Sequence, residues 1–125
     1  MKNTMSCYLF ALALLPLSAI AKDTQQSFKN DVSPIIHDYC LSCHEPGGKG
    51  FEASGLDMRS YQSLMKGTKF GSVIKPGDSF TSIFIQVIEG RVHASIKMPY
   101  GMAGGLSKPN IHIMKKWVEQ GAKNN

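Results

Sequence analysis

The chain has 125 residues and a mass of 13.7 kDa, with 42% hydrophobic and 18% charged residues. This length allows one small domain and excludes a multidomain enzyme, and the formal net charge of +5 is too modest to indicate nucleic-acid binding. Because much of the apolar content lies near the N-terminus, the rest of the chain has few residues for a core, and we expect a disulfide, a metal or a large apolar cofactor to complete it.

The first 21 residues have the pattern of a secretory signal peptide. Lys2 gives a positive start, residues 7–17 form an apolar run, and the small residues that signal peptidase requires end at Ala21. The alternative is a membrane anchor, but the run is too short to cross about 30 Å of hydrocarbon as a helix. We therefore expect cleavage after Ala21, which removes Lys2 and leaves a charge of +4. The mature protein would be periplasmic or secreted, without a membrane span.

The first predicted helix leads into a pair of cysteines. Its apolar residues recur at the spacing of one helical face: Phe28, Val32, Ile35, Ile36 and Tyr39. Proline is tolerated only in the first turn of a helix, and Pro34 lies inside this pattern. We therefore predict a regular helix that begins with Ser33 as its N-cap, preceded by an irregular segment.

Residues 40–44 read Cys-Leu-Ser-Cys-His, which is the C-x-x-C-H signature of covalent haem attachment. The thiols of Cys40 and Cys43 would add across the two vinyl groups of the porphyrin, and the spacing lets both sulfurs reach one edge of the ring. His44 follows directly and would be the proximal ligand of the iron. The motif therefore predicts one covalently bound haem c, which is attached after export.

Three other uses of Cys40 and Cys43 are weaker alternatives. A thioredoxin-like pair needs a preceding strand, and none is predicted. A structural zinc site needs four ligands, and the other histidines are not closely paired with one another. A disulfide would close a very small loop and would stabilise the fold little.

Four glycines lie in residues 45–57, and their Gly-Gly-Lys-Gly stretch lacks the Lys-Ser/Thr step of a phosphate-binding loop. We predict a flexible loop that crosses one edge of the haem. Residues 60–66 then predict a short helix that ends at Gly67.

Two further helices are predicted in the C-terminal half. A turn at residues 76–79 precedes a helix capped by Asp78 or Ser79, which ends at Gly90. Its apolar face contains Phe80, Ile83, Phe84, Val87 and Ile88. A loop covers residues 91–106.

The last predicted helix begins at Ser107, has Pro109 in its first turn and ends at Gly121. Its apolar face contains Ile111, Met114, Trp117 and Val118. Since no strand pattern is present, we predict an all-α fold of about four short helices around one haem.

Several short motifs occur in the order typical of one family. They are Val32-Ser-Pro-Ile-Ile, the C-x-x-C-H motif, Gly55-Leu56, Pro76-Gly77-Asp78, Met98-Pro99 and Trp117-Val-Glu-Gln-Gly-Ala. The chain thus resembles the class I c-type cytochromes, most of all short bacterial monohaem forms such as the Planctomycete-type domains. This resemblance implies a cytochrome c domain over residues 28–125, after a short extension at 22–27. It also implies that the last helix, through Trp117 and Met114, packs against the Ile35, Ile36 and Tyr39 face of the first.

The distal iron ligand decides between electron transfer and ligand binding, because an open site binds small molecules. Met98 is our predicted ligand, since it lies in a loop and Pro99 restricts its backbone. Met102, His93 and an open site are the alternatives. The remaining candidates suit other roles: Met65 and Met114 suit the core, His112 suits the surface, and Met58 lies too early in the chain.

The expected function is that of a monomeric single-electron carrier rather than an enzyme. The alternatives are a haem enzyme or gas sensor with a labile distal ligand, and a docked electron-transfer subunit of a periplasmic dehydrogenase. Redox partner proteins with acidic surfaces would meet lysines that the family places near the ring, namely Lys69, Lys75 and Lys97.

Overall fold

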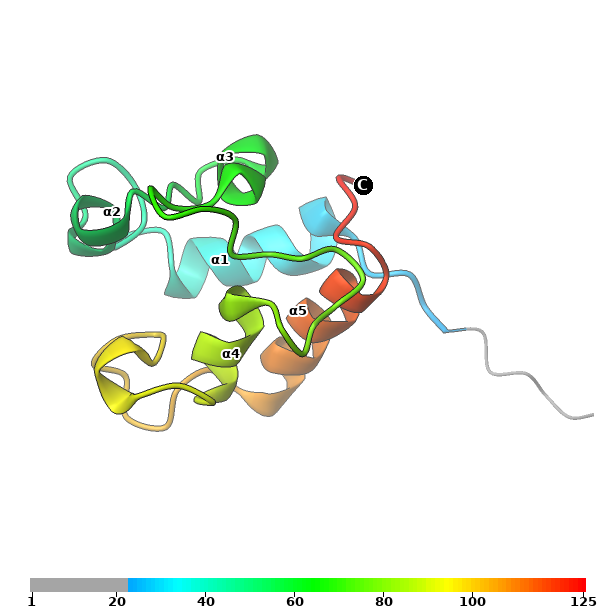
Figure 1. The fold of residues 1–125 in the computed structure, drawn as a ribbon. Helices are drawn as coiled ribbons and strands as arrows, with labels where there is room; N and C mark the ends of the chain where they lie inside the picture. The colour runs from blue at the N-terminus through cyan, green and yellow to red at the C-terminus, as the bar shows by residue number, and fades with distance from the viewer. Residues whose placement is uncertain (1–22) are drawn as a thin grey trace, which may run out of the picture.

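The computed structural model describes residues 23–125, so the predicted signal peptide lies outside the described residues. Over residues 23–125 the chain forms five α-helices, one π-helical turn and one 3₁₀ turn, with no strand (Figure 1). The elements are η1 (Phe28–Val32), α1 (Ser33–Tyr39), α2 (Lys49–Ser54), α3 (Tyr61–Lys66), α4 (Ile83–Glu89), η2 (Ala94–Ile96) and α5 (Lys108–Glu119). The predicted all-α class is confirmed. No helix in this part of the chain is long and apolar enough to cross a membrane.

The first helix begins earlier than predicted. Ser27, not Ser33, is its N-cap, and the Ser27 N–H donates to the Asp31 carboxylate at 2.7 Å. Pro34 has no N–H and would clash with the carbonyl four residues before it in a regular helix. The chain relieves this conflict with a π turn, in which the Ser33 N–H donates to the carbonyl of Phe28, five residues back. The irregular segment was predicted, but Ser33 lies inside a continuous helix.

The core forms where α5 packs against η1 and α4. Trp117 is fully buried, its ring lies 5.5 Å from that of Phe28 and 6.4 Å from that of Tyr61, and its Nε1–H donates to the Lys123 carbonyl at 2.9 Å. The predicted packing of the last helix on the α1 face is therefore only partly right. Ile35 and Ile36 do belong to the same buried cluster as Trp117, but Tyr39 is 39% exposed.

Helix α4 begins three residues later than its apolar pattern predicts. The predicted cap at Asp78 or Ser79 is wrong, because Asp78 caps a separate turn: its Oδ1 accepts from the Thr81 N–H at 3.0 Å, and its carbonyl accepts from the Ser82 hydroxyl at 2.7 Å. Phe80 lies in that turn and is 73% exposed rather than part of the apolar face.

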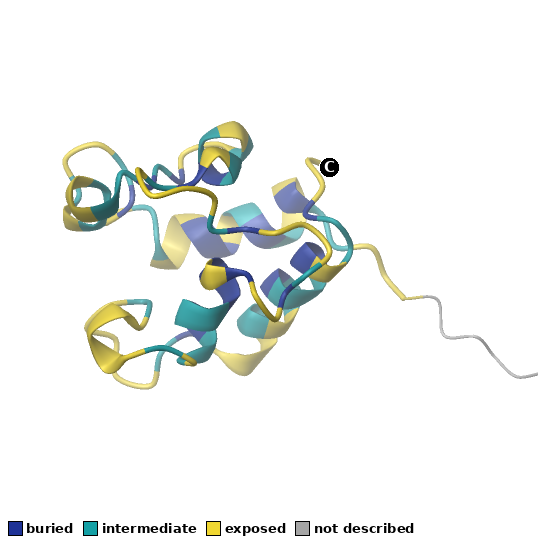
Figure 2. Ribbon diagram, viewed as in Figure 1, coloured by how far each residue is buried: buried dark blue, intermediate teal, exposed yellow. Residues whose placement is uncertain are grey.

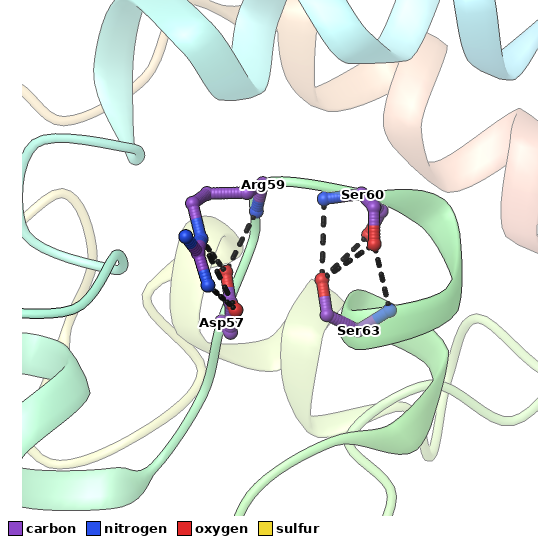
Figure 3. Close-up of polar contacts among 4 residues, drawn as sticks. All are labelled: Asp57, Arg59, Ser60 and Ser63. Carbon is purple, nitrogen blue, oxygen red and sulfur yellow. Dashed lines mark hydrogen bonds and ion pairs between the residues drawn. The ribbon is translucent and has the colours of Figure 1, made fainter.

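The helices α3 and α5 begin and end as predicted. Ser60 caps α3 through a reciprocal pair of bonds with Ser63 (Figure 3). The helix stops at Gly67. The Ser107 hydroxyl accepts from the backbone at the start of α5, and Gly121, with a φ of +100°, lies just after its end.

Buried residues concentrate in η1, α1, α4 and α5, whereas η2 and its flanking loop are largely exposed (Figure 2). Together, η2 and that loop expose three large apolar side chains, of Ile96, Tyr100 and Met102. In Figure 1 this loop and α2 lie toward the same end of the molecule, where α1 stops. The predicted site residues lie in or next to these segments.

Candidate functional site

A tight turn at the end of α1 brings the two thiols and the imidazole together. The Cys40 N–H donates to the Ile36 carbonyl at 2.9 Å and so closes the helix. The Cys40 carbonyl then accepts from both the Cys43 N–H, at 3.2 Å, and the His44 N–H, at 3.0 Å. Both cysteines are free thiols, with Cys40 half-buried and Cys43 exposed. The disulfide alternative is therefore not formed in the structure.

The environment of Cys40 differs from that of a redox-active cysteine. Burial, together with the nearby Cys43, raises the pKa of the Cys40 thiol to about 11. A thioredoxin-like nucleophile needs a lowered pKa, and no strand precedes this pair within residues 23–125. The zinc alternative also lacks support, because the described residues contain no group of three or more His, Cys, Asp or Glu that could hold a metal ion.

His44 is buried, with 7% of its surface exposed. Burial lowers the pKa of its ring, and the Leu56 backbone partly offsets that effect. The ring is therefore neutral at neutral pH, which is the form that binds a metal. Its Nδ1 is the one buried side-chain nitrogen or oxygen in the described residues that lacks a hydrogen-bond partner of normal geometry. A neutral, buried imidazole next to two free thiols fits the donor set of a covalently attached haem.

The segment after α2 returns to His44, where the Leu56 backbone partly offsets the effect of burial on the pKa of the ring. The chain after α2 turns through Gly55, whose φ of +74° is left-handed, and this turn points the next residue back toward the ring.

Helix α2 lies in the segment predicted as a flexible loop, and that prediction is wrong for residues 49–54. The helix packs directly on the haem motif, since the Phe51 N–H donates to the Cys43 carbonyl at 2.9 Å. The glycines make this approach possible. A Cβ at Gly48 would lie 2.5 Å from the Cys43 carbonyl oxygen, and one at Gly50 would lie 2.7 Å from Cε1 and 2.9 Å from Nε2 of His44. Glycines at alternate positions were thus a signal of close packing rather than of flexibility.

We expect Gly50→Ala to disturb the haem site although it favours the helix. Alanine in place of glycine stabilises a helix interior by about 0.5–1 kcal/mol. At this position the added methyl group would overlap the His44 ring, so the ring must move. The expected result is a lower thermal midpoint and a lower yield of haem-loaded protein, measured by calorimetry and by haem absorbance per mole of chain.

The matched control is Ala53→Gly, because Ala53 is an exposed residue of the same helix. This change should weaken α2 by propensity alone and leave the haem absorbance unchanged. A Gly50→Ala protein with a raised thermal midpoint and a normal haem yield would contradict the steric role of Gly50.

Residues 56–58 hold the backbone of His44 from a second direction. The Met58 N–H donates to the His44 carbonyl at 2.8 Å, and the Met58 side chain is buried in the core. Its neighbour Asp57 accepts a hydrogen bond from the Arg59 guanidinium at 2.8 Å, and these bonds lower the pKa of the Asp57 carboxyl (Figure 3). The segment is therefore anchored at its exposed side by an ion pair and at its inner side by His44.

Met98 is half-buried and packs against the hydrophobic core. Its N–H donates to the carbonyl of Val87 at 3.0 Å, so the backbone of this loop residue is tied to α4. Of its two predicted rivals, Met102 is 43% exposed, and His93 is exposed with its Nδ1 bonded to Ser95. The predicted burial of Met114 and the predicted exposure of His112 are both confirmed, and Met65 is half-buried against the core.

The family described as Planctomycete cytochrome C matches residues 40–99, which run from the first cysteine of the motif to the proline after Met98. This part of the chain is a Planctomycete-type cytochrome c domain. No curated protein and no solved structure gives a significant match to the chain. Membership of this family implies covalently bound haem and indicates electron transfer rather than catalysis.

The three lysines expected near the haem make contacts with different parts of the cytochrome domain. The Lys75 N–H donates to Ser82 at the start of α4, and its Nζ pairs with Asp78 at 2.9 Å. Met98 is tied to Val87 of that helix, which lies five residues beyond Ser82 and so about 7.5 Å along the axis at 1.5 Å per residue. Lys97 adjoins Met98, and the Lys69 N–H donates to the Ser54 carbonyl at the end of α2 at 2.9 Å. Of the three, Lys97 is therefore the one that adjoins a predicted iron ligand.

Proposed function

We propose that the chain is an exported monohaem cytochrome that carries single electrons. Residues 28–125 would form the domain, and cleavage after Ala21 would release it. The observation that carries this proposal is His44, a buried neutral imidazole that directly follows two free thiols and has a ring nitrogen without a partner. Cys40 and Cys43 would hold the haem covalently, and His44 would be its proximal ligand.

Met98 would be the distal ligand. When bound, haem supplies a one-electron couple, and a thioether sulfur opposite an imidazole raises its potential. Each residue has a separate task here: α2 and residues 56–58 orient His44, and the bond to the Val87 carbonyl fixes the backbone of Met98. With both axial positions filled by protein groups, small molecules would be excluded from the iron, which favours a carrier over a haem enzyme or gas sensor.

Optical spectra of the oxidised and reduced protein, with and without CO, test this proposal. We expect one haem per chain that resists acid–acetone extraction, a weak far-red band from methionine on ferric iron, and no rapid CO binding. Rapid CO binding by the reduced protein would instead support the gas sensor or enzyme. Intact mass of the protein from the periplasmic fraction tests cleavage after Ala21.

A docked subunit of a dehydrogenase would give the same spectra. Size-exclusion chromatography of the native periplasmic fraction separates the two, since a diffusible carrier elutes as a single small chain. Elution with a larger partner would favour the subunit.

A further inference from the structure

The hydroxyl of Ser54 links two backbone segments that contact His44. Ser54 is the last residue of α2, and its Oγ donates to the carbonyl of Gly50 at 2.6 Å. The same Oγ accepts from the N–H of Leu56 at 3.2 Å. A hydroxyl has one donor and two acceptor sites, so one Ser54 side chain can make both bonds at once.

The two partners of the Ser54 hydroxyl, Gly50 and Leu56, belong to different segments near His44. Gly50 of α2 lies against the ring, at the Cε1–Nε2 edge. Leu56 begins the segment that returns to the His44 backbone, since the Met58 N–H donates to the His44 carbonyl at 2.8 Å. Gly55, which lies between α2 and this segment, is in a left-handed turn. The Ser54 backbone is itself held, since its carbonyl accepts from the Lys69 N–H at 2.9 Å.

We propose that Ser54 is a positioning residue for the proximal ligand: through Gly50 and Leu56 its hydroxyl sets the orientation of the His44 ring. This inference rests on the proposed function of His44 and concerns a residue that the haem motif does not contain. Contacts around a ligating histidine fix the orientation of its ring, and such outer contacts change metal properties when they are removed. Loss of the hydroxyl would free α2 and residues 56–58 to move relative to each other, so the imidazole would be held less firmly as a donor to ferric iron.

The test compares Ser54→Ala with Ser54→Thr and with Ser60→Ala. Threonine keeps the hydroxyl and is the rescue variant. Ser60 is the matched control, because its hydroxyl also bonds a helix terminus but belongs to α3 (Figure 3). We expect Ser54→Ala to shift the redox equilibrium against a fixed mediator several-fold toward the reduced protein, and to move the ¹⁵N resonances of the His44 ring. Ser54→Thr should restore both, and Ser60→Ala should change neither.

A purely structural role predicts a different result. If Ser54 only capped α2, Ser54→Ala would lower the thermal midpoint as Ser60→Ala does, with an unchanged redox equilibrium and unchanged His44 resonances, and this would overturn the inference. The His44 resonances are recorded on the reduced protein as isolated, whether or not it holds haem. Wild-type protein without covalent haem would refute the proposed function alone, because the ring resonances would still report whether Ser54 orients His44.

Discussion

Replacing Cys40 and Cys43 together by Ser should abolish covalent haem attachment. The hydroxyl of serine does not add across a vinyl group under the conditions in which a thiol does, so neither thioether can form. The chain should then accumulate without haem, or any haem that it holds should be removed completely by acid–acetone extraction. Since the domain has a small core, the haem-free chain should also be less stable and more readily degraded in cells.

The single variants refine this expectation. Cys40→Ser and Cys43→Ser should each lower the yield of haem-loaded protein, and Cys40→Ser should lower the thermal midpoint more, because Cys40 packs against the core whereas Cys43 is exposed. Ser42→Ala is the control, as Ser42 is an exposed residue between the two cysteines. Covalent haem in the double variant, made with the c-type maturation machinery, would show that attachment occurs elsewhere.

Local signals explain which helices could be predicted. Helices α3 and α5 each have a serine N-cap and a glycine just past the end, and these signals act within a few residues. A local signal also explains why the predicted start of α4 was wrong. Asp78 is a strong local cap, but it caps the turn before the helix. The apolar spacing alone could not show that Phe80 belongs to that turn.

Helix α2 could not be predicted, because its formation depends on tertiary contacts rather than on local sequence signals. Gly50 weakens a helix in isolation, but with the N-cap residue Gly48 it allows the backbone of α2 to pack on the Cys43 carbonyl and the His44 ring. The π turn of η1 could be predicted only in part. Pro34 indicates that the helix is irregular, but it does not indicate that the irregularity is a π turn.

The candidate site also has a part that could be predicted from local sequence and a part that could not. Cys40, Cys43 and His44 lie within five residues, and their spacing is itself the signature of haem attachment. The motif could therefore be found from the sequence alone. The residues around His44 come from later segments, and only the folded chain brings Gly50 to its ring and Met58 to its carbonyl. Sequence spacing does not encode such contacts.

Replacing Met98 by Ala should change the chemistry of the iron without unfolding the domain. The Met98 N–H would still donate to the Val87 carbonyl, so the backbone of the loop keeps its anchor while the sulfur is lost. Reduced protein should then bind CO rapidly, and the far-red band of the oxidised protein should disappear. The reduction potential should fall, because the soft thioether favours Fe(II), and axial ligation spans about 0.8 V across haem proteins.

Met102→Ala is the matched control for this experiment. Met102 lies in the same loop and is 43% exposed, so its removal should leave CO binding, the far-red band and the potential unchanged. Loss of the far-red band in Met102→Ala, but not in Met98→Ala, would move the distal ligand to Met102. A bis-histidine spectrum in the wild type would move it to His93, whose ring would first have to leave Ser95. Since Met98 alone among these three packs against the core and has its backbone tied to α4, its sulfur can be held in place at the smallest entropic cost.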